Sequence, residues 1–288
     1  MASRSFVQRH ALDIGLISPL LIFIFGFTLI PVLTSIGYSF VDPVSKAFPS
    51  LANYAYMFEQ NTFREAVVNT LVITGVGLTL EMALALGLAL MLTREFKGQG
   101  IVRSILLLPM GVPTLVSAVV MSYIFSLSGY ANELLFKLGL ATVPVVWTGG
   151  GFLTLMTVVF ADMWKVTPMV MLMLLAGLQA IPKDVYEAGD VDGVTTWQRF
   201  TLITLPLLQP AITMALILRA IDAFRIFDLT MVLGGKQTPV VATFSYYEWA
   251  AYNNPYTSGA GATILLLMIL VFVLGYLKVV EGKREDLD

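Results

Sequence analysis

The sequence predicts an all-α membrane protein whose chain crosses the bilayer six times. Hydrophobic residues make up 57% of the 288 residues and charged residues only 12%, with a mean hydropathy of +0.83. Soluble domains of this size contain far less apolar sequence. The apolar residues also form long runs, and a run of about 20 residues spans the ~30 Å hydrocarbon core as a helix.

The six predicted spans form one transmembrane domain over residues 1–288. They lie at approximately 12–40, 66–93, 104–127, 152–178, 207–233 and 259–280. The first is predicted to stay uncleaved, because its apolar run is longer than that of a signal peptide. Pro109 and Pro113 interrupt the third span, and irregular backbone at membrane depth is tolerated where it lines a cavity.

The basic residues predict the orientation of these spans. If the N-terminus is cytoplasmic, most Lys and Arg residues outside the spans fall on the cytoplasmic side, among them Arg4, Arg9, Arg94 and Lys97. Such an excess is typical of cytoplasmic loops. Both termini and the polar segment 181–206 are therefore predicted to face the cytoplasm.

The polar segment 181–206 reads IPKDVYEAGDVDGVTTWQRFTLITLP and is too charged to cross a bilayer unaided. A short helix is predicted over Lys183–Val191, because Pro182 suits a first helical turn and a carboxylate is favourable near a helix N-terminus. Asp192-Gly193 is predicted to end this helix, since Gly tolerates a left-handed conformation. Thr195 or Thr196 is the predicted cap of a second helix.

The spacing of several residues in this segment resembles that of a known loop. Glu187-Ala188-Gly189, Asp192-Gly193, Phe200, Ile203 and Leu205-Pro206 together resemble the EAA loop of permeases in binding-protein-dependent ATP-binding-cassette importers. Gly189 stands where that pattern usually has a second Ala. An ordinary amphipathic loop would explain the polarity of the segment but not this joint spacing.

The resemblance implies the type I importer permease fold, with a coupling loop that docks on a separate ATPase. The residues that it implies for this contact are Lys183, Asp184, Val185, Tyr186, Glu187, Ala188, Asp190, Asp192 and Gly193. Glu187 is the candidate for a polar contact to the ATPase, and Asp192-Gly193 is expected to set the angle between the two helices of the loop.

The fourth and fifth predicted spans carry charged residues, which are costly at membrane depth. Each acid can have a basic neighbour on its own helical face, because the residues of four pairs are three apart: Asp162 and Lys165, Arg219 and Asp222, Asp222 and Arg225, and Arg225 and Asp228. These groups either form structural ion pairs or bind the hydroxyl groups of a polar solute. Arg225 and Asp228 are assigned to structure or gating, and the sequence does not decide between these roles.

Two further stretches resemble the maltose- and trehalose-type carbohydrate permeases. They are AFRIFDLTMVLGG at 223–235 and DMWKVTP at 162–168. The resemblance implies a pathway for a sugar, expected to be a di- or oligosaccharide such as trehalose or maltose, although neither the sugar nor the side chains that select it can be specified. The implied pathway residues are Met110, Asp162, Lys165, Val166, Met169, Arg219, Asp222, Ala223 and Ile226.

The same resemblance implies the partners and the location of the chain. A second homologous permease, an ATPase dimer and an extracytoplasmic solute-binding protein are expected, in the cytoplasmic (inner) membrane of a prokaryote. No Walker motif is present in the sequence, so ATP and Mg²⁺ are expected on the ATPase subunits and no cofactor on this chain. The net charge of −2 and the absence of a long basic run give no indication of nucleic-acid binding.

Other functions fit the sequence less well. An importer for another polar solute, such as a polyol or glycerol phosphate, is the nearest alternative. A proton-coupled transporter would be expected to show internal repeats, and the sequence shows none. With no Cys and with His10 as its only His, the sequence suggests neither an intramembrane catalytic site nor a metal site.

Overall fold

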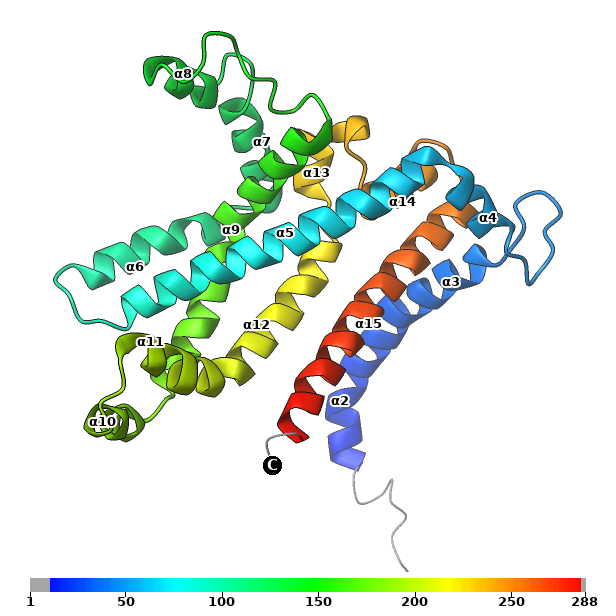
Figure 1. The fold of residues 1–288 in the computed structure, drawn as a ribbon. Coiled ribbons are helices and arrows are strands. Elements are labelled where there is room, and N and C mark those ends of the chain that lie inside the picture. Colours follow the sequence, from blue (N-terminus) through cyan, green and yellow to red (C-terminus); the bar gives the residue numbers. More distant parts are fainter. Residues whose placement is uncertain (1–10, 286–288) are drawn as a thin grey trace, which may run out of the picture. The chain divides into compact units, whose positions relative to one another are not determined.

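The computed structural model describes residues 11–285, so the predicted cytoplasmic residues Arg4 and Arg9 lie outside the described part. The described residues are helical or irregular and contain no strand, which confirms the all-α class (Figure 1). Within the described residues, five helices are long and apolar enough to cross a membrane, and the number is six if a bent helix pair is counted as one span. The chain divides into two compact units, 1–60 with 244–264 and 61–243 with 265–288.

The first unit consists of helices near the N-terminus and the beginning of the last helix. They are α2 (Ala11–Ile24), the π-helical turn η1 (Phe25–Leu29), α3 (Ile30–Ser39), α4 (Ala52–Glu59) and parts of α14 (Val241–Ala250) and α15 (Pro255–Glu285). The Asn53 amide donates to the carbonyls of Ser39 and Val41, at 3.0 and 2.8 Å, which holds α4 against the end of α3. A Cβ at Gly259 would lie 2.5 Å from the carbonyl of Ser35, so glycine permits α15 to approach α3 closely.

The second unit contains the helices that position the site. In chain order they are α5 (Asn61–Leu92), α6 (Gln99–Leu107), η2 (Leu108–Gly111), α7 (Thr114–Ile124), α8 (Tyr130–Lys137), α9 (Gly151–Gln179), α10 (Lys183–Val191), α11 (Thr196–Gln198), η3 (Arg199–Thr204), α12 (Leu205–Phe224), α13 (Asp228–Leu233) and η4 (Gly235–Gln237), with the remainder of α14 and α15.

The core of this unit is formed where α5, α9 and α12 pack together. One apolar cluster includes Ile73, Val158 and Leu229. A second includes Leu174 of α9 and Leu208 of α12. Asp162 and Lys165 of α9 lie in the chain between members of the two clusters. Arg219 and Asp222 of α12 lie between Ala215 of the second cluster and Ile226 of the first, which follows α12.

Two predicted spans differ from the observed helices. The third was predicted at 104–127 with an interruption at its two prolines; it is broken there, and its two helices, Gln99–Gly111 and Thr114–Ile124, are bent by 99°. The fifth span was predicted at 207–233, whereas the continuous helix that contains it starts at Thr196, within the polar segment, and ends at Phe224. Arg225 then leaves the helical conformation, and Asp228 in the first turn of α13 starts a separate helix.

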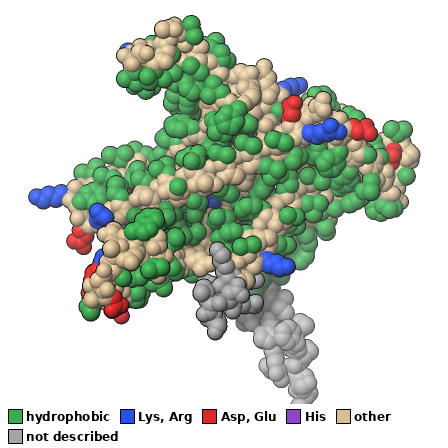
Figure 2. All heavy atoms as spheres, viewed as in Figure 1, with side chains coloured by type: hydrophobic (Ala, Val, Ile, Leu, Met, Phe, Trp, Pro, Cys, Tyr) green, Lys and Arg blue, Asp and Glu red, His purple; other side chains and the backbone are tan. Residues whose placement is uncertain are grey.

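The surface fits a protein that lies in a bilayer. Figure 2 shows that hydrophobic side chains cover much of the visible face, and that charged ones gather at α10 and at the loop between α5 and α6. Large apolar side chains such as Phe27, Leu71 and Val271 are exposed at 73%, 50% and 72%. Exposed apolar surface on this scale is expected where lipid replaces water.

Candidate functional site

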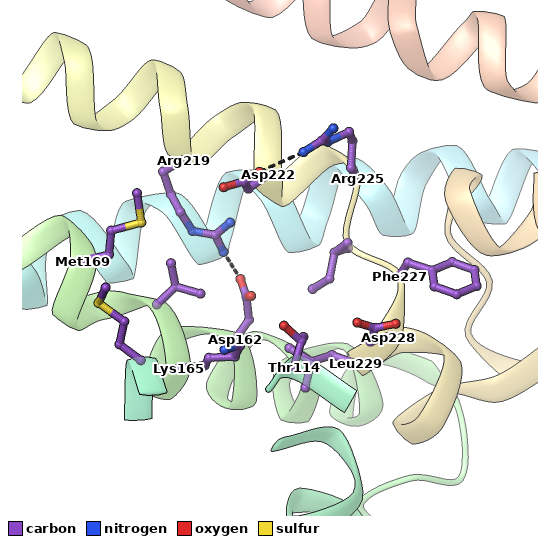
Figure 3. A pocket seen from close by; sticks show the side chains of 13 residues that line it. Thr114, Asp162, Lys165, Met169, Arg219, Asp222, Arg225, Phe227, Asp228 and Leu229 are labelled. Atoms are coloured by element: carbon purple, nitrogen blue, oxygen red, sulfur yellow. Dashed lines mark hydrogen bonds and ion pairs between the residues drawn. The ribbon is translucent and has the colours of Figure 1, made fainter. Parts of the chain in front are cut away.

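A cavity of about 590 Å³ opens among α9, α12, the break in the third span and the chain before α13 (Figure 3). Its lining combines charged groups with apolar side chains. The lining residues are Met110, Thr114, Asp162, Lys165, Val166, Met169, Arg219, Asp222, Arg225, Ile226, Phe227, Asp228 and Leu229. Three of them are carboxylates and three are cations, so the formal charge of the lining balances.

The broken third span forms one wall of this cavity. Pro109 lies in the 3-10 turn η2, and Pro113 precedes α7, where no amide hydrogen is available for a continuous helix. The backbone at Val112 is extended and leaves its carbonyl free of helical bonds. Lys165 of α9 donates to that carbonyl, with 2.7 Å between Nζ and O. The ammonium group therefore ties the break to the fourth span.

A buried ion cluster lies at the inner side of the cavity. Arg219, Glu81 and Asp162 are exposed at only 5%, 0% and 7%. The Arg219 Nε donates to Oε2 of Glu81 at 2.7 Å, and its Nη2 donates to Oδ2 of Asp162. The cluster joins α5, α9 and α12, and a buried charge is tolerated only when it is paired in this way.

The structure changes the pairing that the sequence predicted. Arg219 pairs across helices with Asp162 and Glu81 rather than with Asp222 of its own helix. Asp222 pairs with Arg225, the other basic residue three positions away that the spacing allowed, at 3.0 Å, and both side chains are more than half exposed. Spacing along one helix cannot reveal a partner on another helix, and the only signal for Glu81 was a charge in an otherwise apolar span.

The cavity brings together most of the predicted pathway residues. Met110, Asp162, Lys165, Val166, Met169, Arg219, Asp222 and Ile226 all line it. Ala223 does not, because it packs in an apolar cluster with Leu78 and Phe272. Adjacent positions of a helix project about 100° apart, so Asp222 can face the cavity while Ala223 faces the core. Thr114, Phe227 and Leu229 also line the cavity and were not among the predicted pathway residues.

The polar segment forms a short helix and, after a tight turn, the start of a second helix, which continues as the long helix Thr196–Phe224. Helix α10 covers Lys183–Val191, with Asp184 in its first turn and Pro182 as the residue before it rather than within it. Gly193 has a φ of +72°, which explains the need for glycine at the break. Thr195 caps the following helix in a reciprocal capping box with Gln198.

Helix α10 is fastened to the base of the fifth span. Asp190 forms an ion pair with Arg199, and the hydroxyls of Tyr186 and Thr204 lie 3.3 Å apart. Gly189 is buried, and a Cβ there would meet Cδ1 of Ile203 at 2.8 Å. Tyr186 is half-buried, and the other residues predicted to contact an ATPase are exposed: Lys183, Asp184, Val185, Glu187, Ala188, Asp190, Asp192 and Gly193.

Comparison with known proteins identifies relatives along nearly the whole chain. The trehalose/maltose transport system permease protein MalF of Thermococcus litoralis is 38% identical over 284 residues, which are 94% of each chain. The trehalose transport system permease protein SugA of Mycobacterium tuberculosis is 38% identical over 208 residues, covering 71% of this chain and 66% of its own.

A solved structure supports the same fold. One chain of a bacterial ABC transporter involved in the import of the acidic polysaccharide alginate superposes with a TM-score of 0.84 at 24% identity, covering 95% of this chain and 96% of its own. Residues 81–281, which include the ion cluster and the polar segment, match the family described as binding-protein-dependent transport system inner membrane component. The chain therefore belongs to that family, the membrane-embedded permease subunits of ABC importers.

Proposed function

We propose that this chain forms the pathway by which an ABC importer carries a neutral sugar, a di- or oligosaccharide such as trehalose or maltose, across the cytoplasmic membrane. The observation that carries the proposal is the cavity of about 590 Å³ between its spans, which offers both hydrogen-bond donors and acceptors. The names of its 38% identical relatives support this class of substrate.

The charge balance of the cavity favours a neutral solute over an anionic one. Asp162, Asp222 and Asp228 face the same space as Lys165, Arg219 and Arg225. Carboxylates accept hydrogen bonds from sugar hydroxyls and the cations donate to them, so a polyhydroxylated ligand can use both. A phosphate or carboxylate would need an excess of positive charge that this lining does not provide. The alternative substrate glycerol phosphate is therefore less favoured than a sugar.

Transport in the proposed importer is driven by a separate ATPase dimer that contacts the segment 181–206. The exposed residues of α10, with Glu187 among them, are the proposed contact, and Gly193 allows the sharp turn that follows. A homologous permease and an extracytoplasmic binding protein complete the proposed assembly. ATP and Mg²⁺ would be bound by the ATPase subunits, and both termini of this chain would lie in the cytoplasm.

The proposal is tested by purifying the tagged chain with its partners and reconstituting the complex in liposomes. A trehalose- or maltose-loaded binding protein is expected to raise ATP hydrolysis and to deliver radiolabelled sugar to the lumen. Purification without an ATPase under gentle conditions would contradict the importer assembly. An assembled complex that responds to a charged or non-sugar solute, and to no sugar, would contradict the substrate class.

A further inference from the structure

Glu81 differs from the other two members of the ion cluster in its position. Arg219 and Asp162 line the cavity, whereas Glu81 does not and is completely buried. It reaches the cluster from α5, a helix that contributes no residue to the lining. A carboxylate in this position can act on a transported solute only through the guanidinium group that it holds.

The hydrogen bonds of Arg219 define the direction in which this guanidinium can act. Its Nε is bound by Glu81 at 2.7 Å and its Nη2 by Asp162, so two helices fix the plane of the group. Its Nη1 makes no hydrogen bond to any of the described residues. Figure 3 shows the side chain extending from α12 towards Asp162 on α9, at the wall of the cavity. Arg219 lines the cavity, so a ligand bound there is a candidate partner for this donor.

We propose that Glu81 is a positioning residue of the transport pathway, which holds Arg219 so that its free Nη1 donates to a hydroxyl group of the solute. The inference rests on the proposed function, because it takes the cavity as the place where the sugar is bound. It assigns a role in solute recognition to a residue that no solute touches.

A purely structural role explains the arrangement of Glu81 less well. Its Oε1 is buried without a hydrogen-bond partner among the described residues, and such an atom is costly. An apolar side chain of similar size would remove the cost of Oε1, but it would leave the buried Nε of Arg219 without its acceptor. The carboxylate provides the one thing that a Leu cannot, an acceptor for the Nε of Arg219.

The test uses the complete importer in liposomes, with saturating trehalose-loaded binding protein, and measures both ATP hydrolysis and uptake of radiolabelled trehalose. Glu81→Leu should lower the sugar delivered per ATP roughly tenfold, because a buried bond to a charged group is lost. Stimulation of ATP hydrolysis by the loaded binding protein should persist. Glu81→Gln keeps an acceptor oxygen and should recover much of the loss.

Two controls separate positioning from structure. Thr74→Val alters another buried side chain on α5, whose hydroxyl has no partner among the described residues, and should leave the uptake per ATP unchanged. In an Arg219→Met background, Glu81→Leu should cause no further loss, because the group through which it acts is already absent.

Three results would overturn the inference. The first is normal sugar uptake per ATP in Glu81→Leu. The second is that Glu81→Leu lowers uptake per ATP in the Arg219→Met background by the same factor as in the wild type. The third is that Glu81→Leu and Glu81→Gln both lose stability and stimulated ATP hydrolysis. Failure of the wild-type complex to transport any sugar would instead reject the proposed substrate class. The same set of variants would then be measured with the solute that the complex does transport.

Discussion

Helices α9 and α12, two of the three that carry the ion cluster, pack closely at Gly177, and a side chain at this position should separate them. A Cβ at this position would lie 2.5 Å from the Cβ of Ala211 and 2.9 Å from Cδ1 of Leu208. Carbon atoms normally approach to about 3.5–4.0 Å, so Gly177→Ala requires α9 and α12 to move apart by about 1 Å. The Cβ of Ala211 is fixed to its backbone and cannot move aside alone.

The expected cost follows from two opposing terms. Overpacking of a close-packed interface costs about 1–3 kcal/mol, while replacing Gly by Ala within a helix gains about 1 kcal/mol. Gly87→Ala is the matched control, because it makes the same replacement at an exposed site of α5 where nothing lies within 4 Å. The difference between the two variants isolates the packing term, and Gly177→Ala should be the less stable by about 1–3 kcal/mol.

The free energies of unfolding of the two variants can be compared by reversible denaturation in mixed detergent micelles, with helicity as the signal. Uptake per ATP should fall in Gly177→Ala as well, because the helix shift displaces Asp162 relative to Arg219. A Gly177→Ala variant that is as stable as Gly87→Ala would refute the argument, since it would mean that α9 and α12 do not meet at this glycine.

Two further predictions concern the turn after α10 and the break in the third span. Gly193→Pro should abolish the stimulation of ATP hydrolysis by the loaded binding protein, because proline cannot adopt a φ near +72°. Gly193→Asn should retain much of this stimulation, since Asn tolerates a positive φ. Equal stimulation in the two variants would contradict the prediction. Lys165→Met should lower sugar uptake and speed amide hydrogen exchange near Val112, because the carbonyl of that residue loses its hydrogen-bond donor. Lys165→Arg should preserve the wild-type uptake and exchange rate. Unchanged exchange in Lys165→Met would show that this hydrogen bond does not hold the break in place.

The sequence was most informative where local chemistry decides the structure. The helix over Lys183–Val191, its end at Gly193 and the cap at Thr195 depend on residues that are neighbours in the chain, and all three were predicted. The bend in the third span was indicated by its two prolines for the same reason. Proline and glycine act on their own backbone, so their effects can be read without knowing the fold.

The sequence was least informative where residues from different helices meet. Glu81 could be recognised as a costly charge, but its partner Arg219 lies 138 residues away in the chain. The fifth span was predicted to start at 207 because the polar residues before it argue against membrane insertion. The helix nevertheless begins at 196, since a capping box starts it outside the apolar stretch. Hydropathy locates the part of a helix that lies in lipid, and capping decides where the helix begins.

The earlier start of this helix connects the two sites of the chain. Helix α10 is bound to its base through Arg199 and Thr204, and Arg219 lies on the same continuous helix, which runs from Thr196 to Phe224. At about 1.5 Å per residue, Arg219 is roughly 30 Å from Arg199 along the helix axis. A helix of this length transmits a displacement of its base to its far end only if it remains stiff. The π-helical turn η3 lies at the base, where α10 is attached, and beyond it the chain stays α-helical up to Phe224, with Pro210 inside that helix. A movement of α10 can therefore be transmitted along this helix to the guanidinium group of Arg219, which is bound by Glu81 and Asp162.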